Sequence, residues 1–237
     1  MERFTTNTFD DEGRISQLEF AIKNVNNAAT SIGFKSKNGL ILIGLKNKLQ
    51  NNFINQLEKI FKLNNDKYVI ISGLFGDAKQ IITILRKNIQ DHFYLFNEEI
   101  TLKSLVEDIS GRLQYFTQNK NTRPFGVSFI FISKNENKIM SCDPAGSINE
   151  WNAKAFGLNE DSINNDFITL KKELSMEEAV YECFKIVSKK QELSVKNAPF
   201  YEVLLVDTEK PGKPKIMAPE QIEQIVKSVR EQQEAAE

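Results

Sequence analysis

The sequence predicts an α+β fold, a four-layer α-β-β-α sandwich with an extra N-terminal helix. Strand-like and helix-like segments come in pairs along the 237 residues, whereas a parallel sheet would require them to alternate singly. One strand, LILIGL at 40–45, is apolar at every position, which indicates burial on both faces. Two antiparallel sheets packed face to face, with helices outside, satisfy both observations.

The first expected element is an amphipathic helix. Apolar residues recur there at spacings of three and four, with Asp10 and Asp11 near its expected start; they are Ile15, Leu18, Ile22 and Val25. An exposed apolar stripe is a liability, so the helix packs on its own core, on a neighbouring chain, or on both. A hairpin follows, in which TSIGF at 30–34 and LILIGL are joined by Asn38-Gly39, a dipeptide typical of tight turns.

The middle of the chain contains strands on either side of a helix pair. A polar connection with Leu49, Phe53 and Leu57 leads to the strand YVIISG at 68–73. Gly73 and Gly76 bracket the turn into a long helix with apolar residues from 81 to 93, and a second helix covers 102–116. Strands return at 127–133 and 138–143, where the turn DPAG closes the second one.

The last third repeats the pattern. Ser175 and Glu178 form a capping-box pattern at the start of a helix, and YEVLLV at 201–206 and KPKIM at 213–217 form a strand pair. A terminal amphipathic helix follows, with Pro219 in its first turn. No repeat or linker divides the chain, so we predict one domain, residues 1–237: a tail (1–11), the N-terminal helix (12–28), the sandwich (29–217), and a C-terminal helix with a charged tail (218–237).

Composition excludes several classes of function. The 31 basic and 32 acidic residues give a net charge of −1, which favours neither nucleic acid nor membrane as a partner. The longest apolar runs span about a third of a bilayer-crossing helix, and the N-terminus lacks the apolar core of a signal peptide. Cys142, Cys183 and His92 are too few for a zinc site, and we expect the cysteines to be buried thiols. We expect no cofactor, no metal, and a cytoplasmic and nuclear location.

Three stretches together resemble the alpha-type subunits of the 20S proteasome: FDDEGRISQLEFA at 9–21, RPFGVSF at 123–129, and DPAG at 143–146 followed by Trp151. Their order and spacing match across nearly the whole chain. EKIFKLNND at 58–66 and YFTQNKNTRPFGV at 115–127 are most similar to the third alpha type of eukaryotes. The resemblance implies the amino-terminal-nucleophile hydrolase fold. It also implies a seven-membered ring with other alpha-type subunits, stacked on a ring of beta-type subunits.

The resemblance implies a noncatalytic role in ring assembly, axial gating and the docking of a regulatory ATPase particle or other activators, in ubiquitin-dependent degradation. The alternative is an amino-terminal-nucleophile threonine peptidase that processing unmasks at Thr30. That chemistry needs a free amine on the threonine, whereas 29 residues precede Thr30 and the one before it is Ala29 rather than glycine. Lys46 stands where catalytic relatives have an orienting Asp. We therefore expect no catalytic residue.

The resemblance also implies a pocket for regulator tails between adjacent subunits. Lys59, Gly73 and Leu74 match the family's pocket residues, a cation and free backbone amides that suit a terminal carboxylate. An exposed Lys59 paired with a nearby carboxylate is the structural alternative.

The gate is where the chain departs from the family pattern. The family's tail Tyr and Asp, its Pro and its helix Tyr fall on Glu2, Arg3, Asp11 and Phe20. Phe20 fills the space of a Tyr without its hydrogen bond, and Asp11 is expected near the N-terminus of the helix. We predict a shorter, less ordered tail, with closure left mainly to other subunits. The gate and helix residues carried over are Glu2, Arg3, Phe9, Asp11, Gly13, Arg14, Glu19 and Phe20.

Overall fold

The computed structural model describes residues 7–46, 58–119, 121–170, 173–210 and 212–234. Its strands form two five-stranded antiparallel sheets. The first sheet has the order β10 (Lys215–Ile216), β9 (Glu202–Asp207), β2 (Gly39–Gly44), β1 (Ser31–Lys35) and β8 (Ala153–Phe156). The second has the order β3 (Ile60–Lys62), β4 (Lys67–Gly73), β5 (Val127–Ser133), β6 (Lys138–Cys142) and β7 (Ile148–Trp151).

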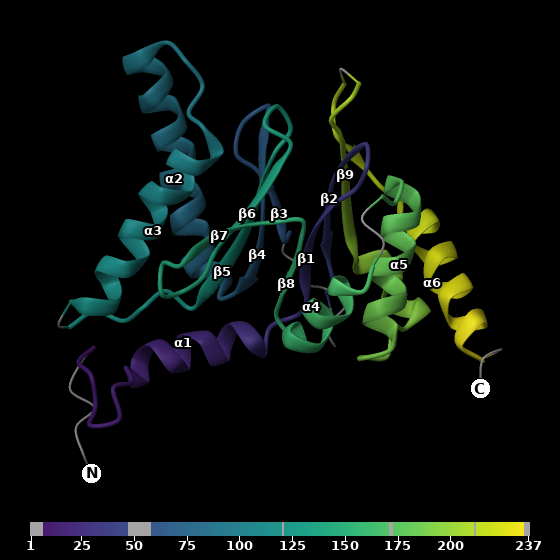
Figure 1. Cartoon of the computed structure of the whole chain (residues 1–237), viewed down its shortest axis with the longest axis horizontal. Coiled ribbons are helices and arrows are strands. Elements are labelled where there is room, and N and C mark those ends of the chain that lie inside the picture. Colours follow the sequence, from purple (N-terminus) through teal and green to yellow (C-terminus); the bar gives the residue numbers. More distant parts are fainter. Residues whose placement is uncertain (1–6, 47–57, 120, 171–172, 211, 235–237) are drawn as a thin grey trace, which may run out of the picture.

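Helices cover both outer faces of the two sheets (Figure 1). The second sheet is covered by α2 (Phe75–Phe96) and α3 (Leu102–Gln118). The first is covered by α4 (Glu160–Ile168), α5 (Met176–Ser188) and α6 (Pro219–Glu234), with the 3₁₀ helix η1 (Val195–Phe200) beside α6. The predicted four-layer α+β sandwich is thereby confirmed. The extra helix α1 (Ser16–Asn26) contacts β4 and β5 at one end of the sandwich.

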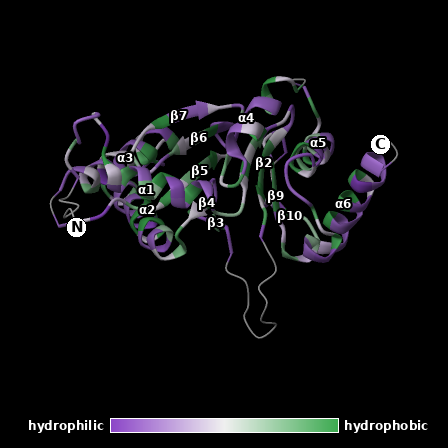
Figure 2. Ribbon diagram, turned by 90° about the horizontal axis from the view of Figure 1, so that it is seen from below, coloured by the Kyte–Doolittle hydropathy of each residue, from purple (hydrophilic) through white to green (hydrophobic). Residues whose placement is uncertain are grey.

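Strand β2 shows why the sandwich suits this sequence. Leu40 and Leu42 pack in the layer between the two sheets, while Ile41 and Ile43 pack against the outer helices. All six residues of β2 are buried, as its unbroken apolar run predicts. Figure 2 shows the same segregation across the molecule, with hydrophobic residues concentrated on strands and on the inward sides of helices.

Several elements differ from the expectation. The sequence did not predict β3, β7, β8, α4 or η1, all of them short. Helix α1 covers less than the expected 12–28, and its N-cap is Ile15, without a side-chain cap. Asp11 therefore lies outside the first turn, where Glu19 is the acidic residue, and the expected helix-dipole role of Asp11 is wrong. The capping box of Ser175 and Glu178 is confirmed. Leu49, Phe53 and Leu57 lie outside the described residues.

Two further expectations concern single features. Cys142 and Cys183 are both buried free thiols, and burial raises the pKa of Cys142 to about 12. Within the described ranges, no helix combines the length and apolar character needed to cross a membrane.

Candidate functional site

Thr30 lies just before β1 and is 1% exposed. Its nitrogen is bound in the peptide link to Ala29, and its Oγ1 donates to the carbonyl oxygen of Leu158 at 3.1 Å. Its own carbonyl accepts a hydrogen bond from the Leu45 amide at 2.9 Å and one from Lys59 Nζ at 3.2 Å. A nucleophilic hydroxyl needs a base that takes its proton. A backbone carbonyl accepts the hydrogen bond but does not take the proton, so this geometry does not activate Thr30.

The side chain of Lys59 points to the same corner of the sandwich. Its Nζ donates to the carbonyls of Ala29 and Thr30, and to that of Leu45 at 3.3 Å. Burial lowers the pKa of Lys59 to about 7, Glu202 opposes the change, and Lys46 adds to it. The alternative of an exposed Lys59 paired with a carboxylate does not hold, because backbone carbonyls surround its amine.

Glu202 ties the two sheets together beside Lys59. Its Oε2 accepts from the backbone amides of Lys59 at 2.9 Å and Ile60 at 3.1 Å, while its Oε1 accepts from Nζ of Lys46. Glu202 belongs to β9 and Ile60 to β3, so this carboxylate joins the first sheet to the edge of the second. Lys46, which stands where catalytic relatives have an acid, is thus neutralised by an acid from another strand.

Gly73 and Leu74 form the corner between β4 and α2. The φ of Gly73 is +121°, and a Cβ there would lie 2.2 Å from the carbonyl oxygen of Gly126. The amide of Leu74 donates to that same oxygen at 2.9 Å. The side chain of Leu74 is 43% exposed, beside the N-terminus of α2. Only glycine fits at 73, and the backbone there is held against Gly126.

The stretch RPFG at 123–126 fixes this corner. Both terminal nitrogens of Arg123 donate to the carboxylate of Asp77, at 2.6 and 2.7 Å, and the amide of Gly126 donates to Asp77 Oδ2 at 2.9 Å. Burial alone would raise the pKa of Asp77, but these hydrogen bonds hold that pKa below its usual range. The ion pair therefore fixes the first turn of α2 against the start of β5.

The backbone of Lys59 lies close to this corner, but its side chain points away from it. The amide of Ile71, two residues before Gly73, donates to the carbonyl of Lys59 at 3.1 Å. The ammonium of Lys59, however, points toward the start of β1. The structure thus places the three residues predicted for the tail pocket on adjoining segments, with the cation turned inward.

The N-terminal helix covers the mouth of the sandwich. Val25 is 2% exposed and belongs to the cluster between the sheets, so α1 closes one end of that layer. Ala21 is also buried, whereas Phe20 and Ile22 are exposed. The apolar stripe therefore packs partly on the core of this chain, and its exposed part remains available to a neighbour.

The described gate residues lie on the surface before and along α1. Gly13 has φ +76°, and its amide donates to the Asp10 carbonyl at 2.9 Å to close a turn. Arg14 lies near the carboxylates of Asp10, Glu12 and Glu19. Phe9 is 75% exposed, and Asp11 is exposed too. Glu2 and Arg3 lie outside the described residues.

Asn7 anchors the segment that precedes the helix. Its Nδ2 donates to the carbonyls of Phe116, Asn119 and Thr122, at 3.1, 3.0 and 3.1 Å. The chain before α1 is therefore attached to the C-terminal end of α3.

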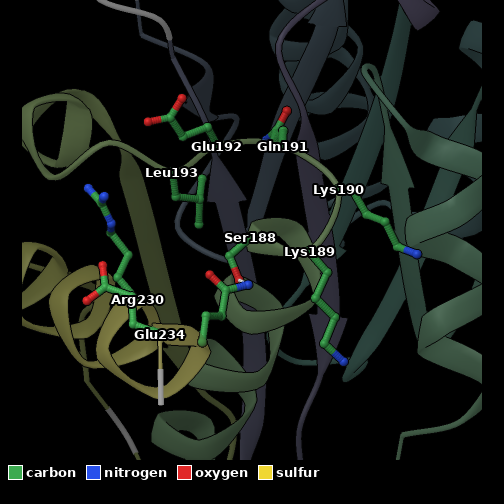
Figure 3. A pocket seen from close by; sticks show the side chains of 9 residues that line it. Ser188, Lys189, Lys190, Gln191, Glu192, Leu193, Arg230 and Glu234 are labelled. Carbon is green, nitrogen blue, oxygen red and sulfur yellow. Dashed lines mark hydrogen bonds between the residues drawn. The ribbon is translucent and has the colours of Figure 1, made fainter. Parts of the chain in front are cut away.

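A surface hollow is lined mainly by polar and charged side chains. It is formed between the end of α5 and the end of α6, and residues 188–193 line it together with Arg230, Gln233 and Glu234 (Figure 3). The carboxylate of Glu192 points away from the amines of Lys189 and Lys190. Their charges do not converge on a point, so this hollow carries no ligand assignment.

Two packed antiparallel sheets, helices outside both, and a buried threonine at the start of the first strand define the amino-terminal-nucleophile type of sandwich. The model of the family described as "Proteasome subunit" matches residues 25–226. The chain belongs to the proteasome subunit family.

Individual relatives agree. The chain is 39% identical to a probable proteasome subunit alpha type-3 of Encephalitozoon cuniculi, over 84% of this chain and 86% of that protein. It is 30% identical to the proteasome subunit alpha type-3 of Saccharomyces cerevisiae, over 78% of this chain and 74% of that protein. It is 31% identical to the proteasome subunit alpha type-4 of Petunia hybrida, over 78% of this chain and 76% of that protein. The resemblance to alpha-type subunits, and to the third type among them, is confirmed, and with it a structural place in the alpha ring.

Sequence reasoning missed the residues that organise the site. Glu202, Asp77 and Asn24 each act through partners far away in the chain. The RPFG stretch belongs to one of the family-like motifs, but nothing in its sequence indicates Asp77 as the acceptor for Arg123.

Proposed function

We propose that this subunit does not hydrolyse peptide bonds, and that it contributes to ring assembly, axial gating and the docking of regulatory particles for ubiquitin-dependent degradation in cytoplasm and nucleus. The observation that carries the proposal is the state of Thr30. Its nitrogen is in a peptide bond, its hydroxyl donates to the carbonyl of Leu158, and its carbonyl accepts a hydrogen bond from the amine of Lys59. Each group that catalysis would need has another partner.

Intact mass of the subunit from purified particles tests this. We expect a mass that includes residues 1–29. An intact mass equal to that of a chain beginning at Thr30 would support the alternative, a threonine peptidase unmasked by processing, and would contradict our proposal.

We further propose that the corner at Gly73 and Leu74 receives the C-terminal carboxylate of a regulatory ATPase. Leu74 is exposed beside the first turn of α2, whose backbone amides favour an anion. Lys59 supplies the cation if its ammonium leaves the carbonyls of Ala29, Thr30 and Leu45. A pKa of about 7 means that an arriving carboxylate favours the charged form.

Particles with Lys59→Met test the pocket. Methionine keeps most of the length of the side chain and removes its charge. We expect a tail peptide with a free carboxylate to stimulate fluorogenic-peptide hydrolysis less than it does in the wild type. The control is Lys62→Met, at the end of β3 and three residues after Lys59, where the exposed amine donates only to Asn65 among the described residues. Equal stimulation of both variants and the wild type would rule out this role for Lys59.

For the gate, we propose that closure rests mainly on other subunits, because the family's tail Tyr, Asp and Pro are replaced here by Glu2, Arg3 and Asp11. Deleting residues 1–6 of this chain should change basal peptide hydrolysis by less than about twofold, since the Tyr and Asp side chains of the family's tail are already replaced in this sequence. A large rise in basal hydrolysis would show that this tail closes the pore.

A further inference from the structure

The carbonyl oxygen of Gly126 joins two elements that the proposed function needs. It accepts the amide of Leu74, at the start of α2, at 2.9 Å. It also accepts Nδ2 of Asn24, from the N-terminal helix α1, at 3.0 Å. A single acceptor thus contacts both the exposed corner and the helix that closes the sandwich.

The surroundings of Gly126 leave this acceptor little freedom. Its amide is held by Asp77 Oδ2 at 2.9 Å. A Cβ on Gly126 would lie 3.0 Å from Leu74 Cδ1 and 3.3 Å from Asn24 Nδ2, so both neighbours touch the backbone here. On the far side, the carbonyl faces Gly73 so closely that a Cβ there would lie 2.2 Å away. In such close packing, a shift of one partner is felt by the others.

We propose that Asn24 is a positioning residue that couples the Gly73–Leu74 corner to α1 through the Gly126 carbonyl. The inference rests on the proposed docking of a carboxylate at that corner. A chain end that accepts the Leu74 amide takes this donor away from Gly126. The carbonyl is then less firmly held, the bond from Asn24 weakens, and α1 loosens at the mouth of the sandwich. Coupling of this kind is reciprocal, so loosening α1 also favours docking.

Hydrogen exchange of the assembled particle, read by mass spectrometry for this subunit, tests the coupling. The probe is a synthetic peptide with the C-terminal sequence of a regulatory ATPase and a free carboxylate, with the amidated peptide as the blank. In the wild type, the probe should slow exchange in residues 74–78 and speed it about threefold in residues 16–26. In Asn24→Leu, residues 16–26 should exchange about fivefold faster without the probe, the effect of losing one hydrogen bond, and should not respond to it.

The variants separate coupling from helix stability. Leucine has as many side-chain heavy atoms as asparagine, with the same branching, and a higher helix propensity, so a weaker helix would not explain faster exchange. The control is Asn26→Leu, the same change two residues on, which should respond to the probe as the wild type does. If residues 16–26 of Asn24→Leu still respond while residues 74–78 are protected, the coupling is wrong and the docking proposal stands.

A second variant tests the coupling without any regulator. Leu74→Pro removes the amide donor at a residue whose φ of −71° suits proline. Residues 16–26 should then exchange about threefold faster, as with the probe, whereas Leu74→Ala, which keeps the amide, should leave them unchanged. Combined with Asn24→Leu, Leu74→Pro should add nothing further. If the increases in exchange of residues 16–26 caused by the two substitutions add fully, the coupling is wrong. If the probe does not slow exchange of residues 74–78 in the wild type, the docking proposal alone is wrong.

Discussion

Replacing Lys59 with methionine should flatten the rise in stability that the wild-type chain shows in mildly alkaline solution. The pKa of Lys59 in the folded chain is about 7, below its ordinary value of 10.5. Between these pH values the unfolded chain binds more protons than the folded chain, so the free energy of unfolding increases with pH. Below this window the amine is protonated in both states and the full cost of burying it remains. Above the window, that cost is gone.

The size of the effect follows from these two values. Each pH unit inside the window changes the free energy of unfolding by about 1.4 kcal/mol. Because the folded amine is half-titrated at the lower end, a change from about pH 7 to about pH 9 should stabilise the wild type by about 2 kcal/mol relative to Lys59→Met. Comparing the two pH values cancels the separate effect of leaving three carbonyls without the amine.

Urea unfolding is the assay, followed by the fluorescence of Trp151, the single tryptophan, whose Nε1 donates to Ser141 Oγ at 2.7 Å. The control is Lys103→Met on α3, where the side chain is 68% exposed. The free energy of unfolding of this variant should change with pH in parallel with that of the wild type. If Lys59→Met also runs parallel to the wild type between the two pH values, the amine is not buried as described and the reasoning fails.

Three further substitutions probe other parts of the structure. Gly73→Ala should destabilise by about 3 kcal/mol in urea unfolding, because φ is positive there and the Cβ meets a carbonyl, whereas Gly111→Ala, with open space in α3, should stabilise by about 1 kcal/mol. Arg123→Ala should cost about 1 to 2 kcal/mol at neutral pH, limited by the 59% exposure of that side chain. The low pKa of Asp77 favours folding above the usual carboxyl range, so this loss should shrink as acid protonates Asp77; a constant loss in acid would contradict it. Ser175→Ala should cost about 1 kcal/mol and speed exchange in the first turn of α5, and an unchanged midpoint would count against the capping box.

The architecture could be predicted because its main elements carry strong local patterns. The unbroken apolar run of β2 indicates two buried faces, and the structure supplies one in each neighbouring layer. Helices α2, α3 and α5 show periodic apolar residues over three turns or more, and the Ser175 cap marks where α5 begins. These signals lie within each segment and need no knowledge of its partners.

The missed elements depend on partners instead. Strand β8 has the sequence AKAF, with little strand propensity, and forms because residues 153–156 pair with β1. Helix α4 has nine residues and begins after Asn159 in a left-handed conformation. The inward direction of Lys59 follows from the position of β3 beside β4, another short strand that carries no pattern of its own. Site geometry built from such segments could not be predicted from local sequence.

The two sheets differ in when their strands leave the ribosome. The second sheet and its covering helices come from one continuous stretch, 60–151, so its pairings are all available early in synthesis. In the first sheet, β2 must wait for β9, with residue 41 paired to residue 205. Until then the nascent chain presents the apolar edge of GLILIG without its partner, a surface prone to aggregation. The second sheet can therefore serve as a template that covers one face of β2 while the rest of the polypeptide is made.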